Sequence, residues 1–470
     1  MEIRMPDKVG EIINMLNQNG YEAFAVGGCV RDSILGKTPQ DWDITTSAKP
    51  FEVKRIFKRT IDTGIEHGTV TVMLGKDGFE VTTYRVDGEY EDNRHPKQVA
   101  FTANLKEDLA RRDFTIKLAE DLKRRDFTIN AMAYNPVSGI VDEFNGLDDL
   151  KHGIIRCVGT ASERFDEDAL RILRAIRFSA QLGFEIEEET QAAMTKKAGH
   201  LENISAERIQ AELVKLLISD HPDRIHDACR LGITKVILPE YDAMVGVAQN
   251  TPNHIYTVDK HTLIALKSIE AVPVLRLTML MHDMGKPEVK KTVEDGRDIF
   301  YRHPEVSARM ARTILKRLKF DNDTLDKVVR LVKWHGLKYN AEAVDVRKAL
   351  NRVGRDIFED FIKVQTADVL AKSPAVIERK LDFLKEKERL YHQIIEENQC
   401  FEIKSLAVNG RDLIAAGIKA GPLLGAVLER LTEEVIEDQS LNTKEKLIAL
   451  AMKVKDDKHI FDEKEYFFRK

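Results

Sequence analysis

The stretch Ala23–Asp43, AFAVGGCVRDSILGKTPQDWD, decides the fold predicted for the first part of the chain. It begins with apolar, β-prone residues, breaks at Gly27-Gly28 and continues as an amphipathic run that ends at Gly36. This order predicts a strand, a glycine turn and the N-terminus of a helix. Such a turn leaves backbone N–H groups free, and glycine lets a phosphate approach them closely. Arg31, on the first helical turn, would add a charge-assisted contact to that phosphate.

Two carboxylates follow the helix within the same unit. Asp41 and Asp43 flank Trp42 and lead into the β-prone Ile44. Residues i and i+2 of a strand point to the same face, so both carboxylates can share hard divalent cations such as Mg²⁺. A glycine pair alone is usually only a turn, and Asp-x-Asp alone is usually a solvated strand end. Side by side, a phosphate cradle and a paired-carboxylate metal site favour nucleotidyl or phosphoryl transfer with two metals.

The combined pattern resembles the GGxVRD…DxD signature of the class II nucleotidyltransferases, which include bacterial CCA-adding enzymes and poly(A) polymerases. The residues that carry the resemblance are Gly27, Gly28, Val30, Arg31, Asp32, Asp41 and Asp43. It implies an α/β nucleotidyltransferase head, with a small mixed sheet and helices. It also implies that Asp41 and Asp43 are catalytic and bind Mg²⁺, while Gly27, Gly28 and Arg31 bind the nucleotide. The implied partners are CTP, ATP and the 3′ end of tRNA.

Composition sets wider limits. At 470 residues the chain should contain three domains or more, at about 100–200 residues each. No apolar run approaches the ~20 residues of a membrane span, and the N-terminus does not read as a signal peptide. The four cysteines are far apart in the sequence, which fits a reducing cytoplasm rather than a disulfide framework. With 73 basic and 78 acidic residues, the net charge of −5 means that a nucleic acid would need a local basic face. Nothing in the sequence indicates the oligomeric state.

A tandem repeat interrupts the expected pattern. Leu105–Lys117 reads LKEDLARRDFTIK and Leu118–Asn130 reads LAEDLKRRDFTIN, with ten of thirteen positions identical. Family members carry this element once, as RRDFTINA, and only the second copy continues in that way. Thirteen residues inserted in a continuous helix would rotate the flanking faces by about 220°. We therefore expect one copy to loop out or to form an extra turn.

The resemblance assigns nucleotide contacts to the second copy. Asp126 and Asn130 would bind the ribose, while Arg124 and Arg125 would contact phosphate or act as structural supports. Upstream, Glu80 lies in a β-like run and is either a third carboxylate for the metal site or an ordinary exposed glutamate. The polar segment Val86–Pro96 resembles the flexible loop with which family members reset the pocket between nucleotides.

Asp168 and Arg171 lie in a helical pattern further along the chain, and Arg174 follows three residues after Arg171. Residues three apart on a helix lie on one face, so Asp168 and Arg171 form either an intrahelical ion pair or a pair that reads Watson–Crick edges. The EDxxR motif of the family, which serves as a protein template for CTP and ATP, favours the second interpretation. Arg174 is placed with these nucleotide-binding residues.

A second group of candidate ligands lies in the amphipathic helices after about residue 200. It comprises His261, His282, Asp283, His303, His335 and Asp368. Imidazoles and carboxylates together suit a divalent transition metal or Mg²⁺ that activates water for phosphoester hydrolysis. The pattern resembles the HD phosphohydrolase domain, in which H…HD…D supplies the ligands, and His303 with His335 would allow a second metal. HD domains fused to CCA-adding enzymes are implied to hydrolyse phosphoesters such as 2′,3′-cyclic phosphates.

The resemblance covers nearly the whole chain and implies four domains. They are the head (1–150), a helical neck with the template motif (151–215), a helical body with the HD motif (216–375) and a helical tail that binds tRNA (376–470). The function expected is the template-independent addition of CCA to tRNA from CTP and ATP, with an HD phosphohydrolase side activity.

Other functions stay open from the sequence. A poly(A) polymerase or an A-adding enzyme would use the same scaffold. An HD phosphohydrolase whose head is disabled by the repeat, or a non-catalytic tRNA-binding protein, would belong to another class.

Overall fold

A computed structural model describes residues 3–65, 68–84 and 118–457. The chain divides into two compact units, Met1–Asp242 with Arg317–Lys319 and Ala243–Lys316 with Phe320–Lys470, and each is described by itself. The polar segment Val86–Pro96 and the first copy of the repeat, Leu105–Lys117, lie outside the described residues, so the predictions made for them stay predictions.

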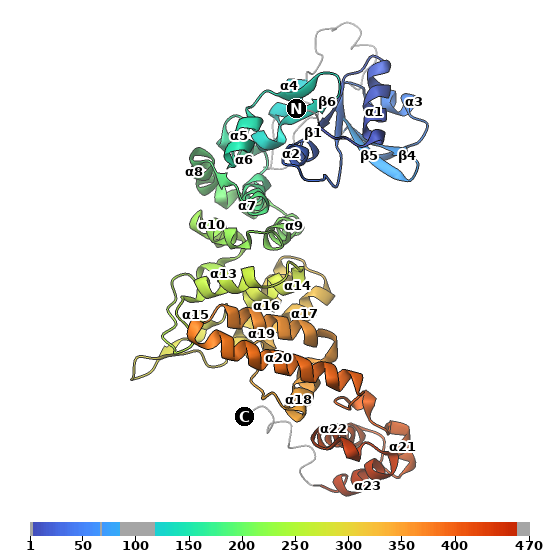
Figure 1. Ribbon diagram of the computed structural model, residues 1–470, viewed down its shortest axis with the longest axis vertical. Helices are drawn as coiled ribbons and strands as arrows, with labels where there is room; N and C mark the ends of the chain where they lie inside the picture. Colours follow the sequence, from blue (N-terminus) through green and yellow to red (C-terminus); the bar gives the residue numbers. More distant parts are fainter. Residues whose placement is uncertain (1–2, 66–67, 85–117, 458–470) are drawn as a thin grey trace. The chain divides into compact units, whose positions relative to one another are not determined.

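The first unit begins with a mixed sheet (Figure 1). Its described strands follow the order β3-β4-β5-β2-β1-β6-β7, and β2 pairs with β5 in parallel while the other neighbours are antiparallel. The strands are β1 Ala23–Val26, β2 Ile44–Thr46, β3 Thr60–Gly64, β4 Thr69–Leu74, β5 Asp77–Thr83, β6 Met132–Asn135 and β7 Gly139–Asp142. The strand, turn and helix predicted for Ala23–Gly36 are present as β1 and the helix α2, which contacts β1 and β6.

Five helices accompany the sheet in the described residues: α1 Asp7–Gln18, α2 Gly28–Ile34, α3 Pro50–Ile56, α4 Leu118–Lys123 and α5 Gly146–His152. Helix α1 turns its apolar residues onto β1 and β2, and α3 contacts β4 and β5 beside it (Figure 1). The second copy of the repeat forms α4, whose Leu118 and Leu122 pack in one cluster with Val26 and Ala133 of the central strands. Burial of these side chains anchors the second copy to the sheet.

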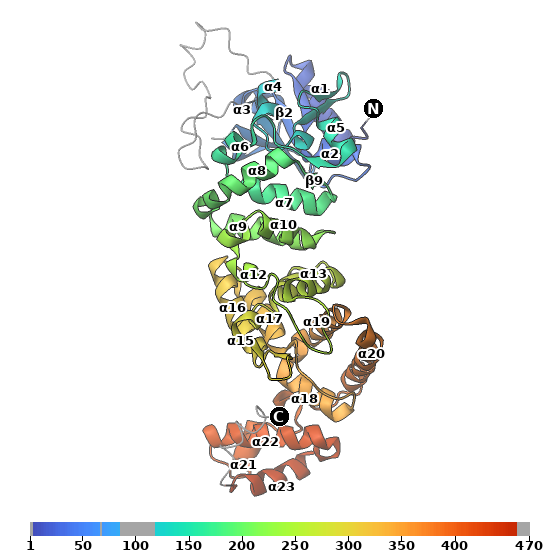
Figure 2. The ribbon, with the colours of Figure 1, turned by 90° about the vertical axis from the view of Figure 1, so that its left-hand side faces the viewer.

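The rest of the first unit is mainly helical. Its helices are α6 Ala161–Glu167, α7 Leu170–Leu182, α8 Glu188–Lys197, α9 Ala206–Leu217, α10 Ile225–Arg230, α11 Thr234–Ile237 and α12 Pro239–Asp242, with the short parallel pair β8 Ile154–Ile155 and β9 Glu185–Ile186. Helix α7 packs along α9 (Figure 2), where Arg177 and Glu212 form a buried ion pair of 2.9 Å.

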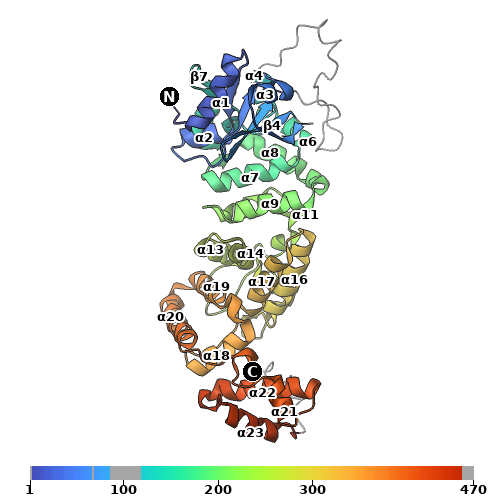
Figure 3. The same cartoon turned by 90° about the vertical axis from the view of Figure 1, so that its right-hand side faces the viewer.

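In its described residues, up to 457, the regular structure of the second unit is helical apart from the hairpin β10 Lys291–Thr292 and β11 Asp298–Ile299. Its helices are α13 Val258–Ser268, α14 Pro273–Met281, α15 Lys286–Val289, α16 His303–Arg317, α17 Asn322–Trp334, α18 Ala343–Val353, α19 Phe358–Leu370, α20 Pro374–Glu396, α21 Gly410–Ala415, α22 Pro422–Glu437 and α23 Lys444–Val454. Helices α13, α14, α17 and α19 pack on one another (Figure 3). The last three helices enclose their own apolar cluster, with Leu413, Leu431 and Leu447 fully buried.

The α/β head followed by helices is the fold class predicted from the sequence, and the structure confirms it. Within the described part of the chain, no helix is both long and apolar enough to cross a membrane. The four domain boundaries stay predictions.

Candidate functional site

The glycine turn after β1 is shaped for glycine. Gly27 has φ +84°, and a Cβ at this position would lie 2.8 Å from Nη1 of Arg125. The Gly27 N–H donates to the Met132 carbonyl at 3.1 Å, which ties the turn to β6. A positive φ and a close guanidinium both exclude a side chain at Gly27, which is itself buried, while Gly28 beside it is half-buried.

The two carboxylates lie directly before β2, which begins at Ile44. Asp41 and Asp43 are exposed while Trp42 between them is buried. In the parallel register Ile44 pairs with Val81, so Glu80 falls level with Asp43 on the neighbouring strand. This placement supports Glu80 as the third carboxylate. Desolvation and the negative charge of Asp41 raise the pKa of Asp43 against the effect of Arg125, so the pair favours a cation.

The ribose residues belong to a hydrogen-bonded chain. Arg31 Nη1 donates to Asn130 Oδ1 at 2.6 Å, and Asn130 Nδ2 donates to Asp126 Oδ1 at 3.1 Å. Arg174 Nε donates to the other oxygen of Asp126 at 2.7 Å. Although burial acts in the opposite direction, Arg174 and Asn130 lower the pKa of Asp126 to about 2. The structure therefore brings these four predicted residues together, and Phe178 lies under both Arg31 and Arg174.

The two arginines of the second copy have different surroundings. Arg124 Nη2 donates to Asp121 at 2.7 Å, whereas Arg125 lies further from that carboxylate, at 3.7 Å, with its guanidinium over Gly27. Of the two alternatives, structural support fits Arg124, and contact with a phosphate fits Arg125.

The expectation that Asp168 and Arg171 lie on one helix face is wrong. Asp168 has ψ 103° and separates α6 from α7, because its Oδ1 accepts from the Leu170 N–H at 3.1 Å. Its other oxygen accepts from Arg208 Nη2 at 2.7 Å. Arg171 instead pairs with Glu167, with its Nη1 2.5 Å from Oε2. The intrahelical ion pair between Asp168 and Arg171 does not form, and each residue of the motif has a different partner.

The second unit brings all six residues of the other group together. His261 comes from α13 and Asp368 from α19, while His282 and Asp283 directly follow α14. His303 is the first residue of α16, and His335 directly follows α17. Two sets have donor atoms close enough for one ion each: His261, His282 and Asp283, and Asp283, His303 and His335. We call these six residues the HD centre.

Each imidazole of the HD centre is held in the same way. Nδ1 faces a backbone carbonyl at 3.0 Å in His261, 2.7 Å in His282, 2.8 Å in His303 and 2.7 Å in His335. A neutral imidazole that donates from Nδ1 keeps a lone pair on Nε2, the usual arrangement of a metal-binding histidine. Burial and the neighbouring histidines lower the pKa of His335 to about 3, so it is neutral at neutral pH.

Asp283 lies between the two sets. Its Oδ2 is 3.2 Å from Nε2 of His282, and its Oδ1 is 3.4 Å from Nε2 of His303. Both oxygens are buried, and Lys286 Nζ lies 2.7 Å from Oδ2. Although burial acts in the opposite direction, His282 and Lys286 hold the pKa of Asp283 well below its usual range.

The Nε2 atoms also face one another. His261 and His282 are 3.3 Å apart at Nε2, and so are His303 and His335. At this distance the two nitrogens share either a proton or a cation. The donor set therefore fits one divalent cation on each side of Asp283, and imidazole with carboxylate suits a transition metal.

Comparisons with known proteins identify the family of the chain. Three family models match: "Poly A polymerase head domain" over residues 23–118 and 117–156, "Probable RNA and SrmB- binding site of polymerase A" over 183–245, and "tRNA nucleotidyltransferase domain 2 putative" over 299–451. The CCA-adding enzyme of Lactiplantibacillus plantarum is 35% identical, over 95% of this chain and 96% of its own. The chain belongs to the CCA-adding enzyme family.

Solved structures of the family share the fold. The Bacillus stearothermophilus CCA-adding enzyme in complex with CTP is 29% identical with a TM-score of 0.70, covering 96% of this chain and 98% of that chain. The Thermotoga maritima CCA-adding enzyme complexed with tRNA_CCA has a TM-score of 0.57 at 21% identity, covering 96% and 97%, and shows the fold alone. As a member of this family the protein is a nucleotidyltransferase.

Sequence reasoning missed several residues of both sites. Lys286 Nζ lies 2.7 Å from Asp283 Oδ2, and its place three residues after Asp283 was a helical-spacing signal. His254 stacks edge-on against His261, with 5.0 Å between ring centroids. Arg208 reaches Asp168 from forty residues away, and no local pattern indicates this contact.

Proposed function

We propose that the head of this protein adds C, C and A to the 3′ end of tRNA from CTP and ATP. The observation that carries the proposal is the exposed pair Asp41 and Asp43 beside the Gly27–Gly28 turn, in a chain related over its full length to CCA-adding enzymes. Two Mg²⁺ ions held by this pair would activate the 3′-hydroxyl and neutralise charge on the triphosphate and the departing pyrophosphate.

The remaining residues position the nucleotide. The backbone of the half-buried Gly28 and the guanidinium of Arg125, which lies against Gly27, contact the phosphates. Asp126 and Asn130 bind the ribose hydroxyls, held in place by Arg31 and Arg174. Asp168 and Arg171 then read the base edge, exchanging their contacts with Arg208 and Glu167 for contacts with the nucleotide.

Incorporation of labelled CTP and ATP, separately and together, on tRNA that ends before CCA tests this proposal. Addition of C, C and A followed by a stop is the expected result. Long A tracts would indicate a poly(A) polymerase, and A added only after an existing CC would indicate an A-adding enzyme. A folded protein that incorporates neither nucleotide would overturn the proposal and favour a head disabled by the repeat.

The HD centre supports a second function, the metal-dependent hydrolysis of phosphoesters. The specific observation is the shared carboxylate of Asp283, whose two buried oxygens each face a different pair of Nε2 atoms. Divalent cations bound there would polarise a phosphoryl oxygen and activate water. Lys286 fixes Asp283 through its ion pair, and Lys372 fixes Asp368 in the same manner.

Metal binding and hydrolysis together test this second function. The Asp41→Ala variant, which lacks the head site, is loaded with Mn²⁺, and electron paramagnetic resonance should show two coupled ions per chain. Hydrolysis of p-nitrophenyl phosphate should follow with Mn²⁺, Co²⁺ or Ni²⁺ and disappear after chelation. Absence of both the coupled signal and hydrolysis would remove the HD centre as an active site.

A further inference from the structure

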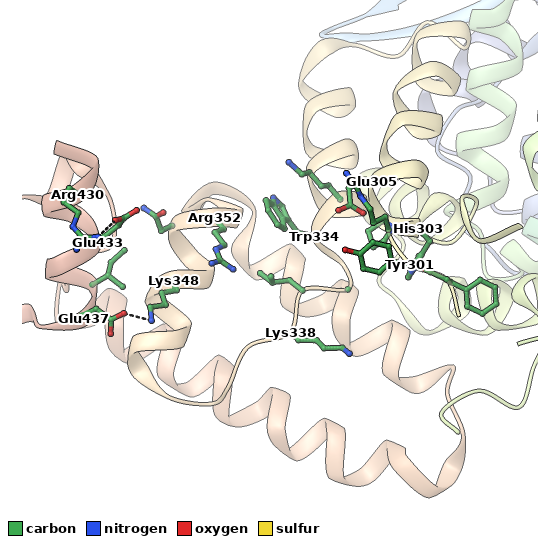
Figure 4. A pocket seen from close by; sticks show the side chains of 18 of the residues that line it. Tyr301, His303, Glu305, Trp334, Lys338, Lys348, Arg352, Arg430, Glu433 and Glu437 are labelled. Atoms are coloured by element: carbon green, nitrogen blue, oxygen red, sulfur yellow. Dashed lines mark hydrogen bonds and ion pairs between the residues drawn. The ribbon is translucent and has the colours of Figure 1, made fainter. Parts of the chain in front are cut away.

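A groove of about 1390 Å³ in the second unit reaches the HD centre. Its walls come from the residues before α16, the end of α17, one side of α18 and the exposed side of α22 (Figure 4). His303, which belongs to both the groove and the HD centre, marks where the two meet. The other ligand of that side, His335, is buried between groove residues Trp334 and Gly336. A phosphoester held beside His303 would therefore have the rest of its molecule in this groove.

The wall next to the HD centre is positively charged. Arg302 directly precedes His303, and Lys333 and Lys338 lie two and three residues from His335, all three exposed. Glu305 is the only acidic residue among the described lining residues of this wall. This arrangement suits an anionic polymer better than a neutral ligand.

On the opposite wall, formed by α18 and α22, ion pairs balance the positive and negative charges. Lys348 Nζ lies 2.5 Å from Glu437 on α22, and Arg430 Nη2 lies 2.8 Å from Glu434 (Figure 4). The acidic side chains of α22 are thus partly neutralised at the groove. The positive charge that these ion pairs do not neutralise lies on the wall that contains His303, where a phosphate would enter.

Two aromatic side chains stand at the same place. Tyr301 is 80% exposed, although a ring this large is normally packed against other apolar atoms. Trp334, at the end of α17 on the same wall, is partly exposed (Figure 4), and Lys333 Nζ lies 4.8 Å from its ring. Exposed rings beside cations are what proteins use to stack the bases of single strands.

The backbone at this entrance is held in a costly conformation. Arg302 has φ +61°, in the left-handed region that residues with a side chain rarely adopt. Phe300 holds the segment from the inside, since its carbonyl accepts from His303 Nδ1 at 2.8 Å and its ring lies 5.4 Å from Lys286 Nζ. Strain that the surrounding structure maintains is typical of functional segments. Here it presents Tyr301 and Arg302 together at the edge of the HD centre.

We infer that this groove binds the end of a single-stranded nucleic acid and presents its terminal phosphoester to Asp283, His303 and His335. Bases stack on Tyr301 and Trp334, and Arg302 with Lys338 contacts the backbone phosphates. The inference rests on the proposed hydrolase function and names its substrate class. A groove of this volume exceeds what one nucleotide fills, so the substrate is a strand of several nucleotides rather than a mononucleotide.

The reaction consumes one water. The water oxygen forms a bond to phosphorus, and the bond between phosphorus and the terminal ester oxygen breaks. A proton of the water ends on that oxygen, which leaves a free hydroxyl on the strand, and phosphate is released.

Binding without metal tests the groove independently of hydrolysis. A fluorescein-labelled hexanucleotide with a 3′-phosphate is titrated with the full chain in EDTA, and its anisotropy is followed. Tyr301→Ala and Arg302→Ala should each weaken binding about tenfold, the effect expected for one lost stacked base or phosphate contact. The matched controls are Phe383→Ala and Arg309→Ala, which remove an exposed ring and an exposed guanidinium outside the groove and should change binding less than about twofold. Equal binding by wild type and both groove variants would overturn the inference.

Hydrolysis with Mn²⁺ then separates this inference from the function on which it rests. We expect kcat/KM for the hexanucleotide to exceed that for p-nitrophenyl phosphate, and the ratio of the two to fall about tenfold in Tyr301→Ala. Hydrolysis of p-nitrophenyl phosphate with no preference for the strand would overturn the inference and leave the hydrolase. Weaker strand binding in the groove variants with no hydrolysis of either substrate would support the groove and overturn the hydrolase.

Discussion

The head site and the HD centre are both built to hold divalent cations, but they hold them differently. In the head, Asp41 and Asp43 are exposed at a strand end and, with Glu80 beside them, offer only oxygens, so the triphosphate and water must complete the ligand set. In the HD centre, four imidazoles and two carboxylates converge, and Asp283 is almost fully buried. We therefore expect the head to bind its cations with the nucleotide, and the HD centre to retain its cations without any substrate.

Removal of one head carboxylate tests this difference most strongly. Asp41→Ala should lower nucleotide addition by at least about 10³-fold, because the remaining carboxylate cannot hold both cations. Hydrolysis by the HD centre should be unchanged. The measurement is incorporation of labelled CTP and ATP on tRNA, with p-nitrophenyl phosphate hydrolysis on the same sample.

The matched control for this variant is Asp77→Ala, which removes an exposed carboxylate of the same sheet that pairs with Lys8. It should keep full activity and nearly full stability, since exposed ion pairs contribute little. Retained nucleotide addition in Asp41→Ala would remove Asp41 from the metal site.

The reciprocal change is Asp283→Asn. Loss of the shared carboxylate should lower phosphoester hydrolysis by about 10²-fold or more and reduce bound metal, while nucleotide addition stays within about twofold. Metal content after gel filtration, measured by mass spectrometry, checks the first effect. Asp323→Asn, an exposed carboxylate on α17 that pairs with Lys327, is the control. Loss of both activities in Asp283→Asn would contradict the separation of the two sites.

The two sites also differ in how much of them the sequence revealed. In the head, the glycine turn follows from local steric rules and is present as expected, and Asp41 and Asp43 are exposed on either side of the buried Trp42, although β2 itself begins only at Ile44. The HD centre needs five chain segments to meet, and only the motif resemblance indicated that they would. Asp168 shows the limit of local reasoning, because its carboxylate caps α7 and binds Arg208 instead of continuing a helix.

Asp126 adds a pH dependence to the head site. Its pKa is about 2 in the folded protein and near 3.8 ordinarily, so as the pH falls the unfolded state binds the proton at a higher pH than the folded state does. The resulting stability, about 2 kcal/mol, is present above about pH 4 and is lost as the pH falls towards 2. Asp126→Asn should therefore unfold more easily at pH 7, by a similar amount, and this difference should shrink below pH 4.

The chain has two tryptophans, Trp42 in the head and Trp334 in the second unit, so the unfolding of the head can be followed separately once Trp334 is replaced. In a Trp334→Phe background, the fluorescence of the buried Trp42 reports urea unfolding of the head. The control is Asp62→Asn, which removes a half-exposed carboxylate that pairs with Lys54 and should change stability by less than about 1 kcal/mol at any pH. A difference between wild type and Asp126→Asn that stays constant from pH 7 to pH 3 would show that the charge of Asp126 is not responsible.

The smallest expected effect comes from alanine substitutions at the glycines on either side of helix α2. Comparing the two substitutions separates the effect of backbone strain from the loss of a contact with the nucleotide. Gly27 and Gly36 both have positive φ, +84° and +71°, so alanine is strained at either position, by about 1 kcal/mol at Gly36 and by more at Gly27, whose ψ is −129°. A methyl group at Gly36 meets no described atom within 4 Å, whereas one at Gly27 would lie 2.8 Å from Arg125 Nη1. Gly27→Ala must therefore displace the guanidinium that we assign to the phosphates. We expect its KM for CTP to rise about tenfold, the loss of one charge-assisted contact, while Gly36→Ala keeps the wild-type KM despite its strained backbone. Equal KM values in the two variants would mean that Arg125 supports the fold and does not bind the nucleotide.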